Sequence, residues 1–210
     1  MLSFQTVLPD TLELLKTLMQ MPELNGMRLV GGTALALQYG HRRSTDLDFF
    51  GESTIELHDF MEVLKNHVEH VVLRNHSKRI YTFFLNGVKV VFVNYLYPWI
   101  DLPVIDEPFR LASPKDIAAM KVNAIIGRGT KKDFIDIYYL LKHFSFDDLI
   151  HFYLQKYQDG SEYRALLSMA YFGDADSQPS PYIYEKIEWE KIKQRIRNEV
   201  EAYNQKLRFR

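Results

Sequence analysis

The 210-residue chain contains no cysteine. This absence excludes a disulfide framework, a thiolate metal site and a cysteine nucleophile, and it is typical of proteins kept in a reducing compartment. No apolar run approaches the roughly 18 residues that a membrane span needs, and no basic start leads into an apolar stretch. From these absences we expect a soluble, cytoplasmic protein that makes no contact with a membrane.

An excess of charge of either sign is also missing. The chain has 26 lysines and arginines against 27 aspartates and glutamates, which gives a formal net charge of −1. No global field therefore attracts nucleic acid, and any contact with RNA or DNA needs a local basic surface.

The end of the chain offers one such surface. Its basic residues are Lys191, Lys193, Arg195, Arg197, Lys206, Arg208 and Arg210. Acids are interspersed among them at Glu188, Glu190, Glu199 and Glu201. A basic helix can bind an RNA backbone, but the mixed charges favour an ordinary solvated face.

Hydrophobic residues make up 47% of the sequence, which is ample for a core. Apolar patterns predict strands at 27–30, 45–50, 71–73, 79–85 and 88–95. Helical periodicity predicts helices at 9–21, 33–39, 55–67, 113–126, 131–141, 145–157, 161–172 and 184–207. We expect Asp10 to cap the first helix, and loops over 97–108 and 173–181. The order of elements indicates an α+β fold, with a small mixed sheet and flanking helices over residues 1–110 and a helical half over 111–210.

Two glycines follow the first predicted strand. Gly31 and Gly32 let the backbone come close to a ligand, because glycine has no Cβ in the way. The helix predicted to start at about Thr33 adds free N–H groups, and together these features form a natural anion cradle. A glycine pair after a strand is most often a simple turn, so it does not define a site alone.

An acidic pair lies about a dozen residues further on. Asp46 and Asp48 are two residues apart in a predicted strand, so their side chains face one side while Leu47 and Phe49 are buried on the other. Two carboxylates on one face repel each other unless a cation lies between them. Mg²⁺ suits this arrangement, because it typically takes one or two carboxylates together with substrate phosphates. The combination indicates chemistry on a nucleoside triphosphate.

Three short stretches resemble the nucleotidyltransferase AbiEii/AbiGii toxin family, which belongs to the DNA polymerase β-like nucleotidyltransferase superfamily. They are Gly31-Gly32-Thr33-Ala34-Leu35, His41-Arg42-Arg43-Ser44 and Asp46-Leu47-Asp48-Phe49-Phe50. The resemblance implies a Mg²⁺-dependent nucleotidyltransferase with a nucleotidyltransferase-type sheet, in which the helical half closes over the active-site cleft. The residues implied to contact the nucleotide are Gly31, Gly32, Thr33, Arg42, Arg43, Ser44 and Asp136, and those implied to bind the metal are Asp46 and Asp48.

The two arginines allow a second interpretation. Arg42 and Arg43 can neutralise triphosphate oxygens, because arginine binds phosphate through two donors at once. They can equally balance Asp46 and Asp48 or extend into solvent. The residues alone leave these interpretations open, and the resemblance favours the nucleotide.

A lysine is predicted on the apolar face of the helix at 113–126. Lys121 shares that face with Ile117 and Ile125, and burying an unpaired ammonium group is costly. Its charge should therefore lie beside carboxylates or phosphates, unless the side chain reaches the surface. Asp-Ile-Ala-Ala-Met-Lys at 116–121 resembles the lysine motif of the family. By that resemblance Lys121 contacts the triphosphate and takes part in catalysis.

Two acids begin the next predicted helix. Asp133 and Asp136 lie three residues apart and therefore on one face. Acids in a first turn commonly just complement the helix dipole. Lys-Lys-Asp-x-x-Asp at 131–136 nevertheless resembles the last catalytic motif of the family, where the carboxylate near the lysine supports catalysis. We rank Asp133 above Asp136. A further match, Tyr171-Phe172-Gly173-Asp174-Ala175, is assigned no role in chemistry.

One position departs from the family pattern. Polymerase β-like transferases usually carry a third carboxylate on a later strand, and the matching position here is Val91. Either two aspartates suffice, or the chain is a degenerate nucleotide-binding or regulatory module without transfer activity. A plain interaction protein is a third interpretation. The resemblance further implies the toxin of a toxin–antitoxin or abortive-infection system, an RNA acceptor such as the tRNA 3′ end, and an antitoxin protein.

Overall fold

The computed structural model describes residues 1–53 and 55–208. The chain forms two compact units, the first made of residues 1–97 and 102–112, and the second made of residues 98–101 and the chain from Ser113 onward. We call them the sheet unit and the helical unit. The predicted α+β fold with a mixed sheet is confirmed, because all strands of the seven-stranded sheet lie in the first unit and most helices in the second.

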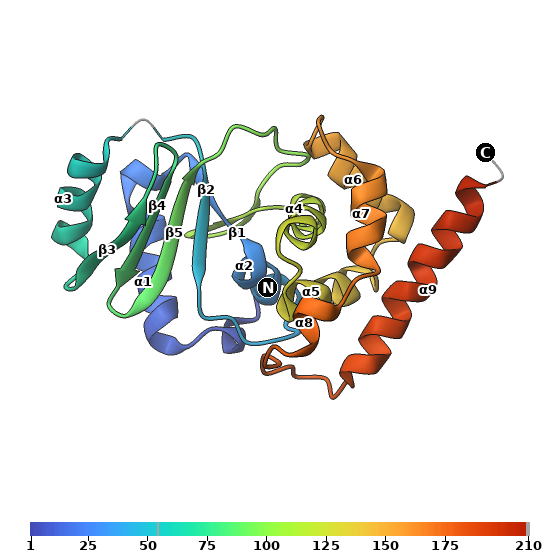
Figure 1. Ribbon diagram of the computed structural model, residues 1–210. Coiled ribbons are helices and arrows are strands. Elements are labelled where there is room, and N and C mark those ends of the chain that lie inside the picture. The colour runs from blue at the N-terminus through green and yellow to red at the C-terminus, as the bar shows by residue number, and fades with distance from the viewer. Residues whose placement is uncertain (54, 209–210) are drawn as a thin grey trace. The chain divides into compact units, whose positions relative to one another are not determined.

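The sheet has the strand order β3-β4-β5-β2-β1-β7-β6 (Figure 1). Its strands are β1 (Met27–Val30), β2 (Leu47–Gly51), β3 (Val71–His76), β4 (Ile80–Leu85), β5 (Val88–Asn94), β6 (Val104–Asp106) and β7 (Phe109–Leu111). β2 lies at the centre, antiparallel to β1 and parallel to β5, which makes the sheet mixed. The predicted hairpin between β4 and β5 turns at Asn86 and Gly87, both with positive φ, as its Asn-Gly sequence requires.

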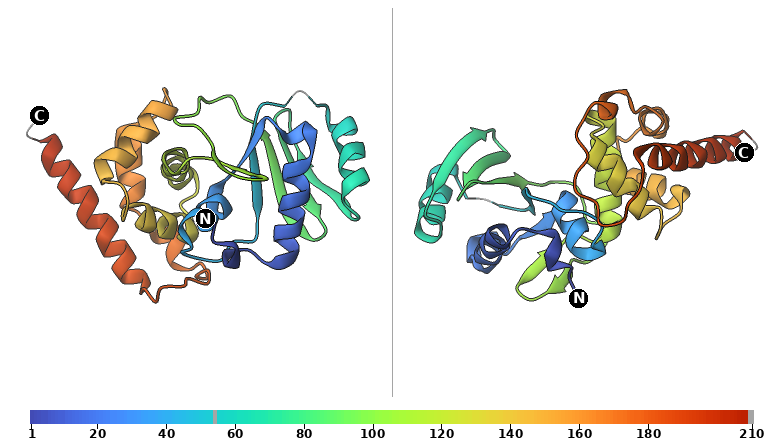
Figure 2. Two further views of the ribbon diagram at one scale, coloured as in Figure 1. Left: turned by 180° about the vertical axis from the view of Figure 1, so that it is seen from behind. Right: turned by 90° about the horizontal axis from the view of Figure 1, so that it is seen from below.

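Three α-helices belong to the sheet unit: α1 (Pro9–Gln20), α2 (Gly31–Tyr39) and α3 (Leu57–His67). Two short 3₁₀ helices, η1 (Phe4–Thr6) and η2 (Pro22–Leu24), flank α1. α3 covers one face of β4 and β5, where the Phe60 ring lies 4.8 Å from the Phe92 ring, edge to face. The left view of Figure 2 shows α1 in dark blue in front of the sheet. The expected cap of α1 is wrong, since Leu8 occupies the N-cap position without a side-chain hydrogen bond and Asp10 lies in the first turn.

The expected loop over 97–108 is partly wrong, because β6 lies within it and forms a hairpin with β7. These strands have three residues each, too few for an alternation of apolar and polar side chains to be recognised. Tertiary contacts stabilise the hairpin instead. The Arg110 guanidinium donates hydrogen bonds to the backbone carbonyls of Met19 at 2.9 Å and Leu24 at 3.2 Å.

The helical unit contains α4 (Pro114–Gly127), α5 (Lys131–Leu140), α6 (Phe146–Lys156), α7 (Glu162–Met169), α8 (Gly173–Asp176) and α9 (Trp189–Leu207). α4 is its central helix, seen end-on in Figure 1, and packs against α5, α6 and α7. Ser113 caps α4 as predicted, accepting a hydrogen bond from the Asp116 N–H at 3.1 Å. None of the described helices is long and apolar enough to cross a membrane.

Two predictions near the end of the chain are wrong. The expected loop at 173–181 contains α8, a single helical turn. The last helix begins at Trp189 rather than at 184. Glu185 explains the later start, because its carboxylate accepts hydrogen bonds from Lys142 at 2.5 Å and Tyr139 at 3.2 Å. These contacts hold the chain before α9 in a non-helical path. Arg210 lies outside the described residues.

A buried ion pair explains why residues 98–101 belong to the helical unit. Lys156 Nζ lies 2.7 Å from Asp116 Oδ1, and both side chains are fully buried. The same ammonium group donates to the Pro98 carbonyl at 2.7 Å and lies 4.6 Å from the centre of the Trp99 ring. Asp116 also accepts the backbone N–H of Ile100 at 2.9 Å. The pair therefore anchors this segment to α4 and α6.

Candidate active site

The glycine turn and the acidic pair come together because of the strand register. β1 and β2 are antiparallel, with Val30 opposite Asp48, and α2 follows β1 directly. Gly31 therefore lies against Asp48, and a Cβ added to Gly31 would be 2.7 Å from Asp48 Oδ2. Gly31 also has a φ of +70°, which residues with a Cβ rarely adopt. Backbone conformation and close approach both require glycine here.

Arg42 lies at the next glycine. A Cβ on Gly32 would collide with the Arg42 guanidinium, and Arg42 is only 2% exposed. Its Nη1 donates to the Arg43 carbonyl at 2.9 Å, which helps to fix the guanidinium beside the turn. The Arg43 side chain is exposed. The structure thus brings Arg42 to the glycine turn.

Thr33 connects the turn to the chain that precedes β2. Its side chain is buried, and its hydroxyl donates to the backbone carbonyl of Asp46. It also shares a hydrogen bond of 2.8 Å with the Ser44 hydroxyl. These bonds fix the segment 44–46 against the start of α2. Thr33 and Ser44 therefore position the acidic pair.

The residues of the acidic pair alternate in burial with their apolar neighbours, as the sequence predicted. Asp46 directly precedes β2, Asp48 lies within it, and both are partly buried, whereas Leu47 and Phe49 are completely buried on the other face. Two carboxylates are the oxygen ligands that Mg²⁺ prefers, so the donor set fits this metal. Within residues 1–53 and 55–208, no cluster of three or more His, Asp or Glu residues could hold a metal. A metal at the pair would therefore take its other ligands from substrate phosphates and water.

The register also shows which side chain stands beside the pair on the next strand. β2 and β5 are parallel, and Asp48 lies opposite Val91. Facing residues of adjacent strands point to the same side of the sheet. Val91 thus lies next to Asp48 on β5, at the position where polymerase β-like transferases usually carry a third carboxylate.

The other predicted residues form a separate cluster in the helical unit. Lys121 Nζ lies 2.8 Å from Asp133 Oδ1 and 2.6 Å from Asp136 Oδ2, and both aspartate side chains are 0% exposed. The Thr130 hydroxyl donates to Asp133 Oδ2 at 2.5 Å, and Arg128 Nε lies 3.5 Å from the same oxygen. We call these residues the Lys121 cluster. It joins the middle of α4, at Lys121, to the start of α5.

The cluster controls the charge state of its acid. Burial alone would raise the pKa of the Asp133 carboxyl, but attraction to Lys121 and hydrogen bonds from Lys121 and Thr130 outweigh burial and hold that pKa below its ordinary value. Asp133 is therefore ionised and paired at neutral pH. The expectation that a lysine on an apolar helix face lies beside carboxylates or phosphates agrees with this arrangement. Direct contact of Lys121 with a nucleotide stays a prediction.

Two members of this cluster were not predicted from the sequence. Thr130 and Arg128 both precede α5 and both contact Asp133. Thr130 stands three residues before Asp133, which is the spacing of a helix cap and its acid. That spacing was a usable signal. The contact between Arg128 and Asp133 depends on the path of the backbone after α4, and no sequence pattern near Arg128 predicts it.

A cavity of about 680 Å³ in the sheet unit lies apart from the acidic pair. Phe60, Tyr81 and Phe92 line it, and Arg79 is among its polar residues. Phe60 belongs to α3, so this cavity is on the α3 side of the sheet, whereas Asp48 alternates with the residues buried on that side. It contains none of the predicted site residues.

Known proteins resemble this chain in fold and in sequence. Two solved structures share the fold: a putative nucleotidyltransferase from Helicobacter pylori (TM-score 0.62, 19% identity, covering 96% of this chain and 97% of the other) and JHP933 from Helicobacter pylori (TM-score 0.55, 18% identity, covering 96% and 95%). An uncharacterized protein of Aquifex aeolicus (strain VF5) is 33% identical over 199 residues, or 91% of this chain and 94% of that protein. The model of the family described as "Nucleotidyl transferase AbiEii toxin, Type IV TA system" matches residues 13–208.

Proposed function

Since this chain belongs to the AbiEii family of nucleotidyltransferase toxins, we propose that it transfers a nucleotide from a nucleoside triphosphate to a hydroxyl group at the Asp46–Asp48 pair. The observation that carries this proposal is the contact between the glycine turn and the acidic pair, where Gly31 leaves no room for a side chain beside Asp48. The backbone N–H groups at a helix start, next to carboxylates that could bind a metal, are what a triphosphate needs.

In this proposal, different residues of the sheet unit bind the metal, bind the phosphates and position the acidic pair. Asp46 and Asp48 would hold Mg²⁺, which when bound supplies positive charge that offsets the charge developing on the transferred phosphoryl group. The Gly31-Gly32 backbone and the Arg42 guanidinium bind phosphate oxygens. Thr33 and Ser44 fix the acidic pair through the hydrogen bond between their hydroxyls. The pair is thus held in place before a nucleotide binds, which lowers the cost of binding.

For the helical unit, we propose one contact with the nucleotide, made by Lys121. Lys121 already contacts the carboxylates of Asp133 and Asp136, so a contact with the triphosphate requires Nζ to exchange one carboxylate for a phosphate oxygen. Asp133 then keeps Lys121 oriented, and Asp136 is the carboxylate that it releases. Closure of the helical unit over the nucleotide is part of this proposal.

The family suggests the finer assignments. We propose an RNA hydroxyl as acceptor, with the tRNA 3′ end as the first candidate, and a separately encoded antitoxin protein as partner. Such a reaction takes place in the cytoplasm, where the acceptor is found. An abortive-infection role would follow from blocking translation in this way.

A transfer assay tests the proposal. Purified protein is incubated with Mg²⁺, each of the four labelled nucleoside triphosphates in turn, and total RNA or a protein fraction as acceptor. We expect label in RNA from one nucleotide. Asp46→Asn should lower the rate by about a thousandfold, since a metal is worth several kcal/mol in the transition state, while the free energy of unfolding changes by less than about 0.5 kcal/mol. Unchanged turnover in this variant would contradict the assignment of the pair.

One observation favours a second candidate function. Val91 beside Asp48 cannot act as a base or a metal ligand, as expected for a regulatory module that binds nucleotides without transferring them. This candidate predicts Mg²⁺-dependent nucleotide binding by calorimetry and no label in any acceptor. In that case Val91→Asp should create measurable transfer, because it places a third carboxylate next to the pair. Transfer by the wild-type protein would exclude this candidate.

A further inference from the structure

Strands β3 to β5 carry a local excess of positive charge. Residues 69–95 contain four basic residues, Arg74, Lys78, Arg79 and Lys89, against one acid, Glu69, whereas the whole chain has a net charge of −1. The local net charge is therefore +3. All four basic side chains are exposed. Lys78 and Arg79 line the cavity on the α3 side of the sheet, so Arg74 and Lys89 are the cations considered for the other face. Positive charge gathered in one region of a neutral protein is the electrostatic mark of a polyanion site.

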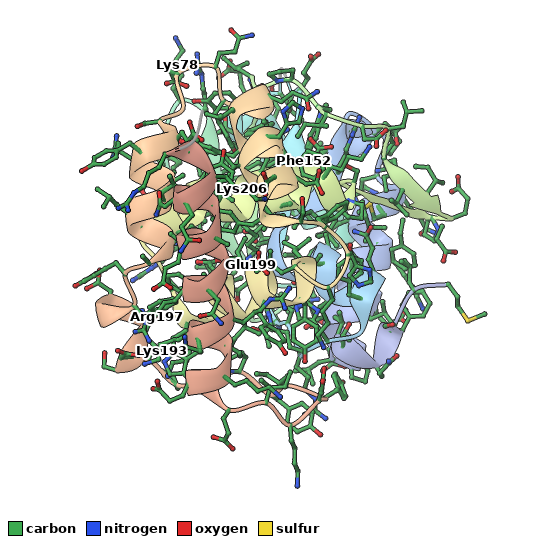
Figure 3. The ribbon with its side chains drawn as sticks, turned by 90° about the vertical axis from the view of Figure 1, so that its right-hand side faces the viewer. Lys78, Phe152, Lys193, Arg197, Glu199 and Lys206 are labelled. Carbon is green, nitrogen blue, oxygen red and sulfur yellow. The ribbon has the colours of Figure 1, made fainter. Side chains whose placement is uncertain are left out.

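The basic side chains of α9 differ from these in one respect. Along α9 (Figure 3), Lys193 pairs with Asp176 at 2.8 Å and with Glu190 at 2.7 Å, and Lys206 pairs with Asp147 at 2.7 Å. None of the four cations of β3 to β5 makes an ion pair with any residue in the described part of the chain. Their charge is thus available to a ligand, whereas much of the charge of α9 is neutralised within the protein.

One face of the same strands continues from the acidic pair. The register places Asp48 beside Val91, Val91 beside Thr82, and Thr82 beside Asn75. Residues that face each other across strands point to one side of the sheet, so these four form a row that starts at the pair and runs to the edge strand β3. Adjacent strands are about 4.8 Å apart, so the row is about 14 Å long.

This face is apolar and accessible. Val72, Ile80 and Phe84 are 57%, 43% and 38% exposed. Val72 of β3 lies opposite Phe84 of β4. Along β4, Ile80 and Phe84 alternate with Tyr81 and Phe83, whose rings pack against Phe60 of α3 on the other face. Exposed apolar and aromatic side chains beside unpaired cations are the composition of surfaces that bind single-stranded nucleic acid, where bases pack on apolar groups and cations follow the backbone.

The two flanks of Asp48 are not equivalent. On the β1 side, the Gly31 turn lies against the Asp48 carboxylate. On the β5 side, Val91 opens onto the exposed face of β4 and β3. If the triphosphate occupies the glycine flank, an acceptor hydroxyl must approach Asp48 from the β5 flank.

We propose that this face of β3, β4 and β5, defined by Val72, Arg74, Thr82, Phe84, Lys89 and Val91, is the platform for the acceptor, and that the acceptor is the single-stranded end of an RNA. The inference rests on the proposed function, because it names the substrate that the acidic pair would modify. Phe84 and Val72 support the bases, and Arg74 and Lys89 contact the phosphates. The terminal hydroxyl reaches the acidic pair along the row of Thr82 and Val91.

Binding of a short labelled single-stranded RNA, measured by fluorescence anisotropy without nucleotide, tests this platform. The variant Arg74→Ala/Lys89→Ala should bind about tenfold more weakly, and the slope of log affinity against log salt should fall by about 1.4, or about 0.7 per lost phosphate contact. Lys16→Ala/Lys65→Ala is the matched control. It removes the same charge from α1 and α3, where each lysine is paired with a glutamate, and it should bind as the wild type does.

Phe84→Ser adds a second readout. It should weaken RNA binding without changing the salt slope, because it removes stacking and no charge. In transfer assays, both sets of platform variants should raise the KM for RNA and leave the KM for the nucleotide unchanged. Equal RNA affinity of the Arg74→Ala/Lys89→Ala variant and its control would overturn the platform, as expected if a protein strand occupies this sheet instead. A wild-type protein that binds RNA here but transfers nothing would contradict the proposed function and leave the platform intact.

Discussion

The two pairs of aspartates in this protein have opposite surroundings. Asp46 and Asp48 of the sheet unit are partly exposed, and Asp48 lies against the backbone of Gly31. Asp133 and Asp136 of the helical unit are 0% exposed and enclose the ammonium group of Lys121. The comparison teaches that an acidic pair can be arranged for a ligand or for the fold. In the helical unit the carboxylates enclose a buried lysine, whereas those of the sheet unit are partly exposed.

The largest effect on stability is expected from removing the lysine that the buried pair, Asp133 and Asp136, encloses. Lys121→Met removes the ammonium group that two buried carboxylates enclose, which should lower the free energy of unfolding by about 3–5 kcal/mol. Lys206→Met is the control, because Lys206 pairs with Asp147 at the surface and should cost at most about 1 kcal/mol. Urea unfolding followed by circular dichroism measures both. Equal losses in the two variants would mean that the Lys121 cluster is not a buried ionic centre.

The dependence of stability on pH should differ in the same way. The pKa of Asp133 is lower in the folded protein than the ordinary value of 3.8. Its contribution to stability is therefore fully present above pH 3.8 and is lost as the pH falls through the folded pKa. The expected slope is at most about 1.4 kcal/mol per pH unit for one proton. Asp133→Asn should flatten the curve of unfolding free energy below pH 4, and parallel curves for variant and wild type would contradict this.

The smallest expected effect on stability tests the glycine turn. Gly31→Ala should destabilise the fold by about 1–2 kcal/mol, because alanine is strained at positive φ, and its Cβ would displace the Asp48 carboxylate. Gly87→Ala is the control, since Gly87 has a φ of +80° and no atom within 4 Å of an added Cβ. Both variants should lose similar stability, but only Gly31→Ala should lose transfer activity. Equal activity in the two variants would separate the turn from the reaction.

Much of the fold was predictable where local signals are strong. β1 was predicted at its observed bounds because the glycines end it abruptly, and Ser113-Pro114 marks the start of α4. The hairpin β6–β7 and the late start of α9 were missed because contacts of Arg110 and Glu185 with distant residues decide them. No local pattern contains such contacts.

In the candidate site, too, local sequence patterns predicted some features, and contacts between distant residues decide the others. The spacing between Gly31 and Asp48 predicted that a turn and a carboxylate pair belong together, because one antiparallel strand pair joins them. The apolar neighbours of Lys121 predicted a carboxylate or phosphate beside it, and the structure shows two carboxylates. Which acids they are depends on how α5 packs on α4, and this is a tertiary property.

The ion pair of Lys156 and Asp116 has a consequence for how the protein can be divided. It holds residues 98–101 within the helical unit although the hairpin β6–β7 that follows returns to the sheet unit. The chain therefore passes between the units at 97–98, at 101–102 and at 112–113. Neither unit is a continuous stretch of sequence. A single breakpoint in the chain therefore cannot separate one complete unit from the other.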